Sequence, residues 1–192
     1  MGKLNEMVDF VSGTPQFRIT ESRAEQAPSY RLYTQTDLLD DLVGIPSEAA
    51  DNKCICTRDQ VNTLGPGDVV FSLIAGTAAV VREAHQGYLY TQNYVKLIPG
   101  EKIDHQFLVY LLNENSAIKK QLLLGLQGSQ VLKYSLKQIK DLAIPTLPPV
   151  EKQKIMGEIY FKQLRVQALK TRAAKQETMM RLHQLEEVTK HD

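Results

Sequence analysis

Residues 144–188 read IPTLPPVEKQKIMGEIYFKQLRVQALKTRAAKQETMMRLHQLEEV, and this stretch decides how the chain is organised. Its first six residues include three prolines, which prevent a helix and favour a stiff extended segment. From residue 150 to residue 188 there is no proline, and Gly157 is the only glycine. The stretch therefore predicts a single helix of about 57 Å, preceded by a sharp break in the chain.

An apolar seam runs along this predicted helix. A heptad pattern places nine residues on the seam, of which six are apolar: Ile155, Ile159, Lys162, Val166, Leu169, Ala173, Gln176, Met180 and His183. A second stripe widens the apolar face: Phe161, Leu164, Ala168, Met179 and Leu182. One long helix cannot bury such a face by itself, so we expect another chain or a second copy to cover it. The alternative is a helix that folds back on its own domain.

The preceding residues predict short strands followed by helices. After a turn at 64–68, the residues at 69–74, 78–81 and 87–98 are rich in β-branched and aromatic types, which indicates a mixed or antiparallel sheet. A helix is expected over 105–124, capped by Asp104 and ended by Gly125, and a shorter one over 135–143 that begins at Ser135. Residues 4–12 predict a short helix or strand, and 16–63 predict short strands and loops. The expected fold class is therefore α/β, in the α+β sense.

Composition is that of an ordinary globular protein. The 192 residues are 43% hydrophobic and 23% charged, with a net charge of +1 that does not by itself indicate a nucleic-acid binder. Residues 1–149 sum to −2 and residues 150–192 to +3. If DNA is bound, folding must gather the basic groups on one face.

No metal or cofactor site is expected. Cys54 and Cys56 are two apart in a predicted strand and are interpreted as structural, because no other cysteine completes a zinc set and the four histidines are scattered. The N-terminus lacks the apolar core of a signal peptide, and no apolar run is long enough for a membrane span. A cytoplasmic location is the expected default.

Catalytic motifs are also missing from the sequence. It contains no phosphate-binding glycine loop, no metalloprotease motif and no nucleophile elbow. The adjacent acidic pairs Asp40-Asp41 and Glu186-Glu187 are interpreted as solvated charge, and nothing in the sequence brings Cys56 to His85 as a nucleophile and its base. A non-catalytic protein is therefore expected.

The order of these pieces resembles the DNA-specificity subunit of type I restriction-modification enzymes. The resemblance lies in LNEMVDFVSGTP at 4–15, LGPGDVVFS at 64–72 with Gly76, QNYVKLIP at 92–99, residues 104–112, and IPTLPPVEKQKI at 144–155. It implies a small, curved-sheet target-recognition domain over 1–147 and a spacer or dimerisation helix over 148–192. Partners implied are double-stranded DNA, methyltransferase subunits and possibly a restriction subunit, with no membrane and no cofactor.

The chain differs from typical members in length. They hold two recognition domains and two spacer helices, whereas this chain has one of each. A homodimer through the last helix restores the full arrangement and reads two inverted half-sites. Pairing with a different specificity chain is the alternative.

The candidate DNA-binding residues have side chains that can reach base edges or phosphates, or are glycines and their neighbours in turns where the backbone can approach DNA closely. They are Thr14, Gln16, Arg18, Gly76, Thr77, Gln92, Asn93, Gln127, Gly128, Ser129, Gln130, Lys133 and Tyr134. The loop 125–135 is the main candidate; the alternative is a plain helix-to-helix turn. Residues 13–15 form an ordinary surface turn in the alternative reading, and Gln92 and Asn93 are edge residues of a strand. Each of Arg23, Arg31, Lys53, Arg58 and Arg82 is interpreted first as solvated charge, with a phosphate contact as the alternative.

Two rival functions remain. One is a coiled-coil assembly or inhibitory protein that keeps the fold without binding DNA, which the near-neutral front portion allows. The other is an enzyme with an unrecognised site. DNA binding and catalytic assays distinguish these from a specificity module.

Overall fold

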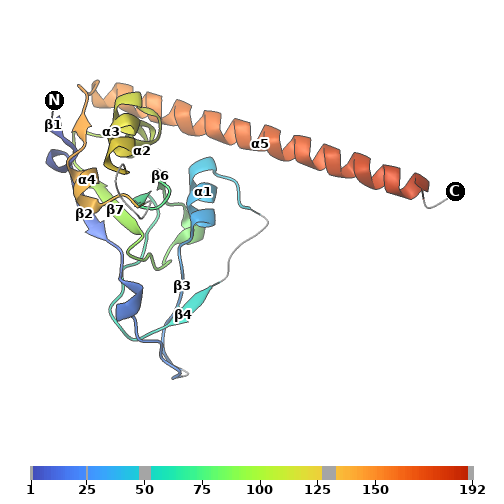
Figure 1. Cartoon of the computed structure of the whole chain (residues 1–192), viewed down its shortest axis with the longest axis horizontal. Helices are drawn as coiled ribbons and strands as arrows, with labels where there is room; N and C mark the ends of the chain where they lie inside the picture. Colours follow the sequence, from blue (N-terminus) through green and yellow to red (C-terminus); the bar gives the residue numbers. More distant parts are fainter. Residues whose placement is uncertain (1, 25, 48–52, 127–132, 190–192) are drawn as a thin grey trace.

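The computed structural model describes residues 2–24, 26–47, 53–126 and 133–189. The chain forms short strands, five α-helices and three turns of 3-10 helix within these ranges (Figure 1). In chain order they are β1 Gly2–Lys3, η1 Leu4–Glu6, β2 Val8–Ser12, η2 Gln16–Arg18, β3 Ser29–Arg31, α1 Gln35–Val43, β4 Cys54–Cys56, β5 Val69–Ser72, β6 Thr77–Val80, η3 Glu83–His85, β7 Tyr94–Pro99, α2 His105–Glu114, α3 Ser116–Leu126, α4 Leu136–Lys140, β8 Ala143–Ile144 and α5 Val150–Thr189.

A four-stranded antiparallel sheet lies at the centre, in the order β2-β7-β5-β6. All four residues of β5 are buried, because β5 is flanked on both sides and both of its faces are covered. Phe71 of β5 lies opposite Ala78 of β6 and Val95 of β7 and is fully buried. The α+β fold class, with antiparallel sheets and a long last helix, is confirmed.

Helices cover this sheet on the side from which α5 departs. The helix α2 packs on β6 with one side and on α5 with the other (Figure 1). The predicted single helix over 105–124 is wrong: it divides at Asn115, whose backbone is extended at φ −66° and ψ 119°. The Asn115 side chain accepts hydrogen bonds from the amides of Ala117 and Ile118, so it ends α2 and starts α3. Gly125 accordingly lies inside α3 rather than after its end.

The helix α1 was not predicted, although its end signals are in the sequence. Thr34 and Asp37 form a reciprocal capping box, and Gly44 ends the helix in the left-handed conformation at φ 72°. Its Asp41 is fully buried, so the interpretation of Asp40-Asp41 as solvated charge is wrong for Asp41.

The root of α5 is fixed to the domain by two residues. Gln153 is buried and its side chain accepts from the Asp104 amide at 3.0 Å and donates to the Lys102 and Pro148 carbonyls. One turn later, Gly157 is buried against α2, where a Cβ would lie 2.6 Å from the Cβ of Gln106. Close approach of the two helices therefore depends on this glycine.

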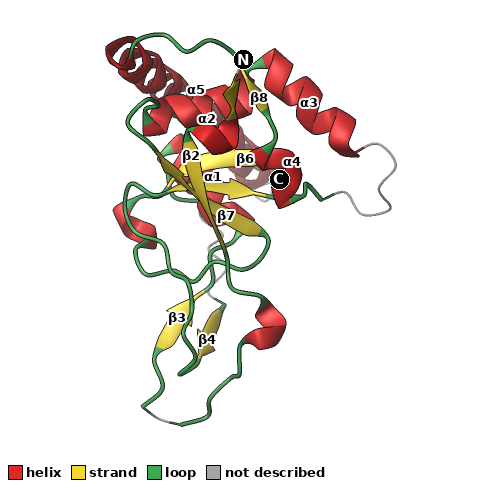
Figure 2. Ribbon diagram, turned by 90° about the vertical axis from the view of Figure 1, so that its left-hand side faces the viewer, coloured by secondary structure: helices red, strands yellow, loops and turns green. Residues whose placement is uncertain are grey.

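A second, smaller unit extends from the opposite end of the sheet. Strands β3 and β4 pair there, around a small cluster of Leu32, Ile55 and Leu89. Figures 1 and 2 show this unit at the end of the domain away from α5. We call residues 14–33 and 53–63 the β3–β4 lobe.

Candidate nucleic-acid interface

Three turns meet at one end of the central sheet and bring several predicted residues together. The Leu73 amide donates to the Asn93 carbonyl at 2.8 Å, and the Tyr134 amide donates to the Leu73 carbonyl at 2.8 Å. The Lys133 ammonium donates to the Asn93 side-chain oxygen at 2.9 Å. Residues 72–77, 91–93 and 133–134, far apart in the sequence, therefore form one surface, which we call the sheet-end cluster.

Glycine is required at the centre of this cluster. Gly76 has φ +65°, and a Cβ there would lie 2.5 Å from the Tyr134 ring. The ring packs edge-on against Phe71, with centroids 6.3 Å apart. Tyr134 thus supports the turn, and Gly76 and Thr77 line a cavity of about 390 Å³ beside α2, α3 and α5.

The turn at 13–15 lies next to this cluster. Thr14 pairs with Thr91, and the Gln92 amide donates to the Thr14 carbonyl at 3.2 Å. Gln16 and Arg18 follow on η2 and are exposed, as is Gln92. Two candidate regions that the sequence suggested separately are therefore adjacent.

The β3–β4 lobe gathers basic side chains that are scattered in the sequence. It carries five Lys and Arg against three Asp and Glu, whereas the rest of 1–149 carries nine against thirteen. The five are Arg18, Arg23, Arg31, Lys53 and Arg58. Arg31 lies over the Tyr88 ring at 5.1 Å, and Arg23, Lys53 and Arg58 are exposed. No local pattern reveals this, because β3 and β4 meet only on folding.

Arg82 has a role other than solvated charge or a phosphate contact. Its Nε donates to the Asp41 carbonyl at 3.0 Å and its amide donates to an Asp41 carboxylate oxygen at 3.0 Å. Its guanidinium lies against Gly44, which leaves no room for a side chain there. Arg82 therefore holds α1 on the domain.

A buried acid–base cluster lies behind the same helix. His85 Nδ1 is 2.8 Å from an Asp41 oxygen, and its Nε2 is 3.4 Å from Asp37. The Tyr33 hydroxyl donates to Asp41 at 2.7 Å. Burial, followed by the charge and hydrogen bond of Asp41, raises the pKa of Tyr33. Because His85 is occupied by these groups and Cys56 lies on β4, the two do not form a nucleophile–base pair.

The two cysteines do not lie in the core, although the sequence predicts a structural role for them. Cys54 and Cys56 are both exposed and flank the buried Ile55 on β4. The described residues include no group of three or more His, Cys, Asp or Glu arranged to hold a metal ion. Within the same ranges, no helix is long and apolar enough to cross a membrane.

The main candidate loop is described only in part. Gln127, Gly128, Ser129 and Gln130 lie outside the described residues. Lys133 and Tyr134, at the end of that loop, belong to the sheet-end cluster.

The helix α5 has two distinct faces. One is buried or half-buried against α2 and α1 along its first five turns, through Gln153, Gly157, Tyr160, Leu164 and Ala168. All nine predicted seam residues are exposed, with Ile155 at 60%, Ile159 at 62% and Met180 at 55%. At 100° per residue, Ile155, Ile159 and Val166 lie on the opposite side of the helix from Gly157. The expected second stripe is in part the domain-facing side, since Phe161, Leu164 and Ala168 are half-buried.

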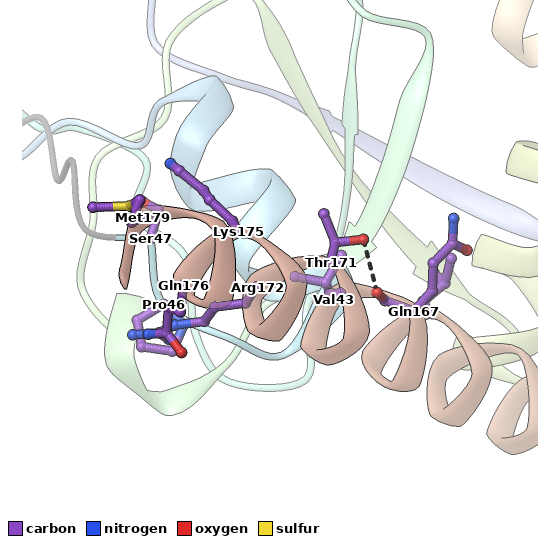
Figure 3. A pocket seen from close by; sticks show the side chains of 11 residues that line it. Val43, Pro46, Ser47, Gln167, Thr171, Arg172, Lys175, Gln176 and Met179 are labelled. Carbon is purple, nitrogen blue, oxygen red and sulfur yellow. Dashed lines mark hydrogen bonds between the residues drawn. The ribbon is translucent and has the colours of Figure 1, made fainter. Parts of the chain in front are cut away.

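Beyond the domain, α5 and the end of α1 enclose an open groove of about 890 Å³ (Figure 3). Val43, Pro46 and Ser47 line one wall; Thr171, Lys175 and Met179 are among the residues of the other. Every described residue of α5 after Ala168 whose side chain is placed is exposed.

Comparison with known proteins shows which family this chain resembles. The family model of the type I restriction modification DNA specificity domain matches residues 51–177. The chain belongs to this family. None of the curated proteins compared with the chain is significantly similar to it.

Solved structures of other proteins share the fold of this specificity domain. One comes from work on complex assembly and conformational transition of the type I R-M system, with a TM-score of 0.62 and 22% identity over 96% of this chain. The HsdS subunit of Thermoanaerobacter tengcongensis has a TM-score of 0.50 and 19% identity over 90% of this chain. The type I S subunit of M. genitalium has a TM-score of 0.50 and 14% identity over 82%. This chain covers only 42%, 39% and 37% of those three chains.

Proposed function

We propose that this specificity domain is a sequence-specific DNA recognition subunit of a type I restriction-modification system. The observation that carries the proposal is the concentration of basic side chains on the β3–β4 lobe of an otherwise acidic front portion. Phosphate contacts made by such a lobe position the duplex, and base edges are then read by neighbouring polar side chains. Gln16 of the lobe and the neighbouring Gln92 and Asn93 supply those side chains.

In this proposal, residues 1–147 bind DNA and residues 148–192 form the contact between subunits. The seam on α5 supports it, because its apolar residues are exposed on the side opposite the domain contacts. A second copy that covers this seam forms an antiparallel coiled coil and presents two lobes to two half-sites. Methyltransferase subunits dock on the same paired helices and supply the chemistry.

The test is an equilibrium DNA-binding assay with the full chain, with and without the methyltransferase subunit of its system. We expect sequence-dependent binding whose affinity falls steeply with salt. Arg23→Gln with Arg58→Gln on the lobe should reduce the slope of log affinity against log salt by about 2, one for each lost phosphate contact. The matched control, Lys154→Gln with Arg165→Gln, removes two exposed charges from α5 and should leave the slope unchanged.

A coiled-coil assembly or inhibitory protein is the second candidate, favoured by the net charge of only +1. It predicts self-association without sequence-dependent DNA binding at any salt concentration, even with the methyltransferase subunit present. That result would exclude the recognition function and would still be consistent with a dimer.

A further inference from the structure

Phe17 is the most exposed large hydrophobic side chain in the described part of the chain, at 78%. It occupies the centre of η2, at the tip of the turn that leaves β2. A single exposed hydrophobic side chain is common on protein surfaces, so the significance of Phe17 depends on how it is held and on its neighbours.

The turn that carries Phe17 is held firmly. Gly13 lies so close to the Thr91 backbone that no side chain fits there, and the Thr14 amide donates to the Tyr90 carbonyl at 3.0 Å. The Thr14 hydroxyl accepts from the Asn62 amide at 2.9 Å. Pro15 then begins η2, and the Arg18 amide closes it with a 3.0 Å bond to the Pro15 carbonyl. The ring is therefore presented on a fixed support.

Its neighbours are suited to nucleic acid. The Arg18 guanidinium lies 5.6 Å from the centre of the Phe17 ring, and the exposed Gln16 precedes Phe17 in η2. Proteins that bend DNA often insert an apolar side chain such as phenylalanine between base pairs, and they place arginine side chains nearby on the DNA. The Arg18 charge beside the ring fits a phosphate backbone better than an apolar protein pocket.

We propose that Phe17 inserts against a base step of bound duplex DNA and partly unstacks it, while Arg18 contacts the adjacent backbone. The proposal rests on the proposed function and deepens it, because Phe17 then selects for steps that unstack easily. Flexible pyrimidine–purine steps are the preferred class.

The test measures the affinity of the full chain for short duplexes of random sequence over a salt series. Phe17→Ala should weaken binding by about 5- to 100-fold at every salt concentration, with the salt slope unchanged, because stacking carries no charge. Phe17→Leu should retain part of the affinity, since leucine also serves as a wedge. Leu124→Ala, which removes an exposed apolar side chain from α3, is the matched control and should have no effect.

A second probe isolates unstacking from simple contact. The same duplexes with one abasic site are already unstacked there, so the wild-type chain should prefer them and Phe17→Ala should lose that preference. If the wild type binds with steep salt dependence but Phe17→Ala keeps both affinity and preference, the wedge is refuted and DNA recognition stands. If Phe17→Ala instead weakens only the binding of the methyltransferase subunit, the Phe17 ring docks on that protein and not on DNA. If the wild type binds no duplex, both proposals fail.

Discussion

The imidazole Nδ1 of His85 lies 2.8 Å from a carboxylate oxygen of Asp41, and both side chains are buried. Asp37 approaches the other ring nitrogen, and the rings of Tyr33 and Tyr88 pack edge-on against the imidazole. Burial disfavours the charged imidazole, but the hydrogen bond and charge of Asp41, followed by the charges of Asp37 and Asp40, outweigh it. The net effect raises the pKa of His85. The cluster ties α1 to the loop after β6.

This arrangement predicts how stability depends on pH. A histidine whose pKa is higher in the folded state contributes stability that is fully present below the unfolded pKa of about 6.5. The contribution is lost as pH rises through the folded-state pKa. The free energy of unfolding of the wild type should therefore fall as pH rises above about 6.5. Chemical denaturation at a series of pH values measures this change.

Removal of the imidazole tests whether His85 causes this pH dependence. His85→Gln should lower the free energy of unfolding by about 3 kcal/mol at low pH, because Asp41 is left buried beside Asp37 without a cation. The difference between variant and wild type should shrink as pH rises. His105→Gln, at an exposed histidine that starts α2, is the control; a difference independent of pH for His85→Gln would contradict the prediction.

Tyr90 offers a case in which loss of a hydroxyl should stabilise. Its side chain is fully buried, its hydroxyl has no hydrogen-bond partner among the described residues, and burial raises its pKa to about 12. Tyr90→Phe removes the cost of an unsatisfied polar group and should raise the free energy of unfolding by about 1 kcal/mol.

Tyr33→Phe is the matched control for that measurement. Its hydroxyl donates to the Asp41 carboxylate, so its loss should cost about 2 kcal/mol. Opposite signs for the two substitutions in thermal or urea unfolding are expected. A destabilised Tyr90→Phe would mean that the Tyr90 hydroxyl has a bonding partner after all.

Gly157→Ala should destabilise the contact between α2 and α5. Alanine is the better helix former by about 1 kcal/mol, but its Cβ would meet the backbone amide of Phe107 at 2.8 Å as well as Gln106. We expect a net loss of about 1–3 kcal/mol, typical of overpacking. Gly65→Ala, whose Cβ would meet only Asp68 at 3.8 Å, serves as the control in the same unfolding assay.

Self-association should depend on the exposed seam of α5. Ile159→Asp with Val166→Asp would bury two unpaired charges in the paired helices and should raise the dimer dissociation constant by about 100-fold or more. Sedimentation measures it. Gln163→Asp with Ala174→Asp changes exposed residues outside the seam and should leave the dimer intact; a dimeric seam variant would place the interface elsewhere.

The features that the sequence predicts well are those set by neighbouring residues. The uninterrupted stretch from 150 to 188 predicts α5, and Asp104 and Ser135 each accept a backbone amide at the start of α2 and α4 as expected. The split at Asn115 was missed because its side chain cap was hidden within a continuous apolar pattern. The capping box at Thr34 is equally local and could have revealed α1.

The candidate interface was harder to predict because it is assembled from distant segments. Lys133 reaches Asn93 across forty residues, and the lobe combines two stretches separated by α1. The burial of Asp41 likewise depends on His85 and Arg82 from beyond β6. No local sequence pattern predicts these contacts between distant residues.

The exposed positions of Cys54 and Cys56 provide a practical handle. They are the only two thiols of the chain, and both lie on the lobe, far from α5 (Figure 1). With Cys54→Ser, a single maleimide spin label on Cys56 reports from that lobe without an engineered cysteine. In an assembled pair, the interval between the two labels gives the separation of the lobes directly, in solution and without crystals.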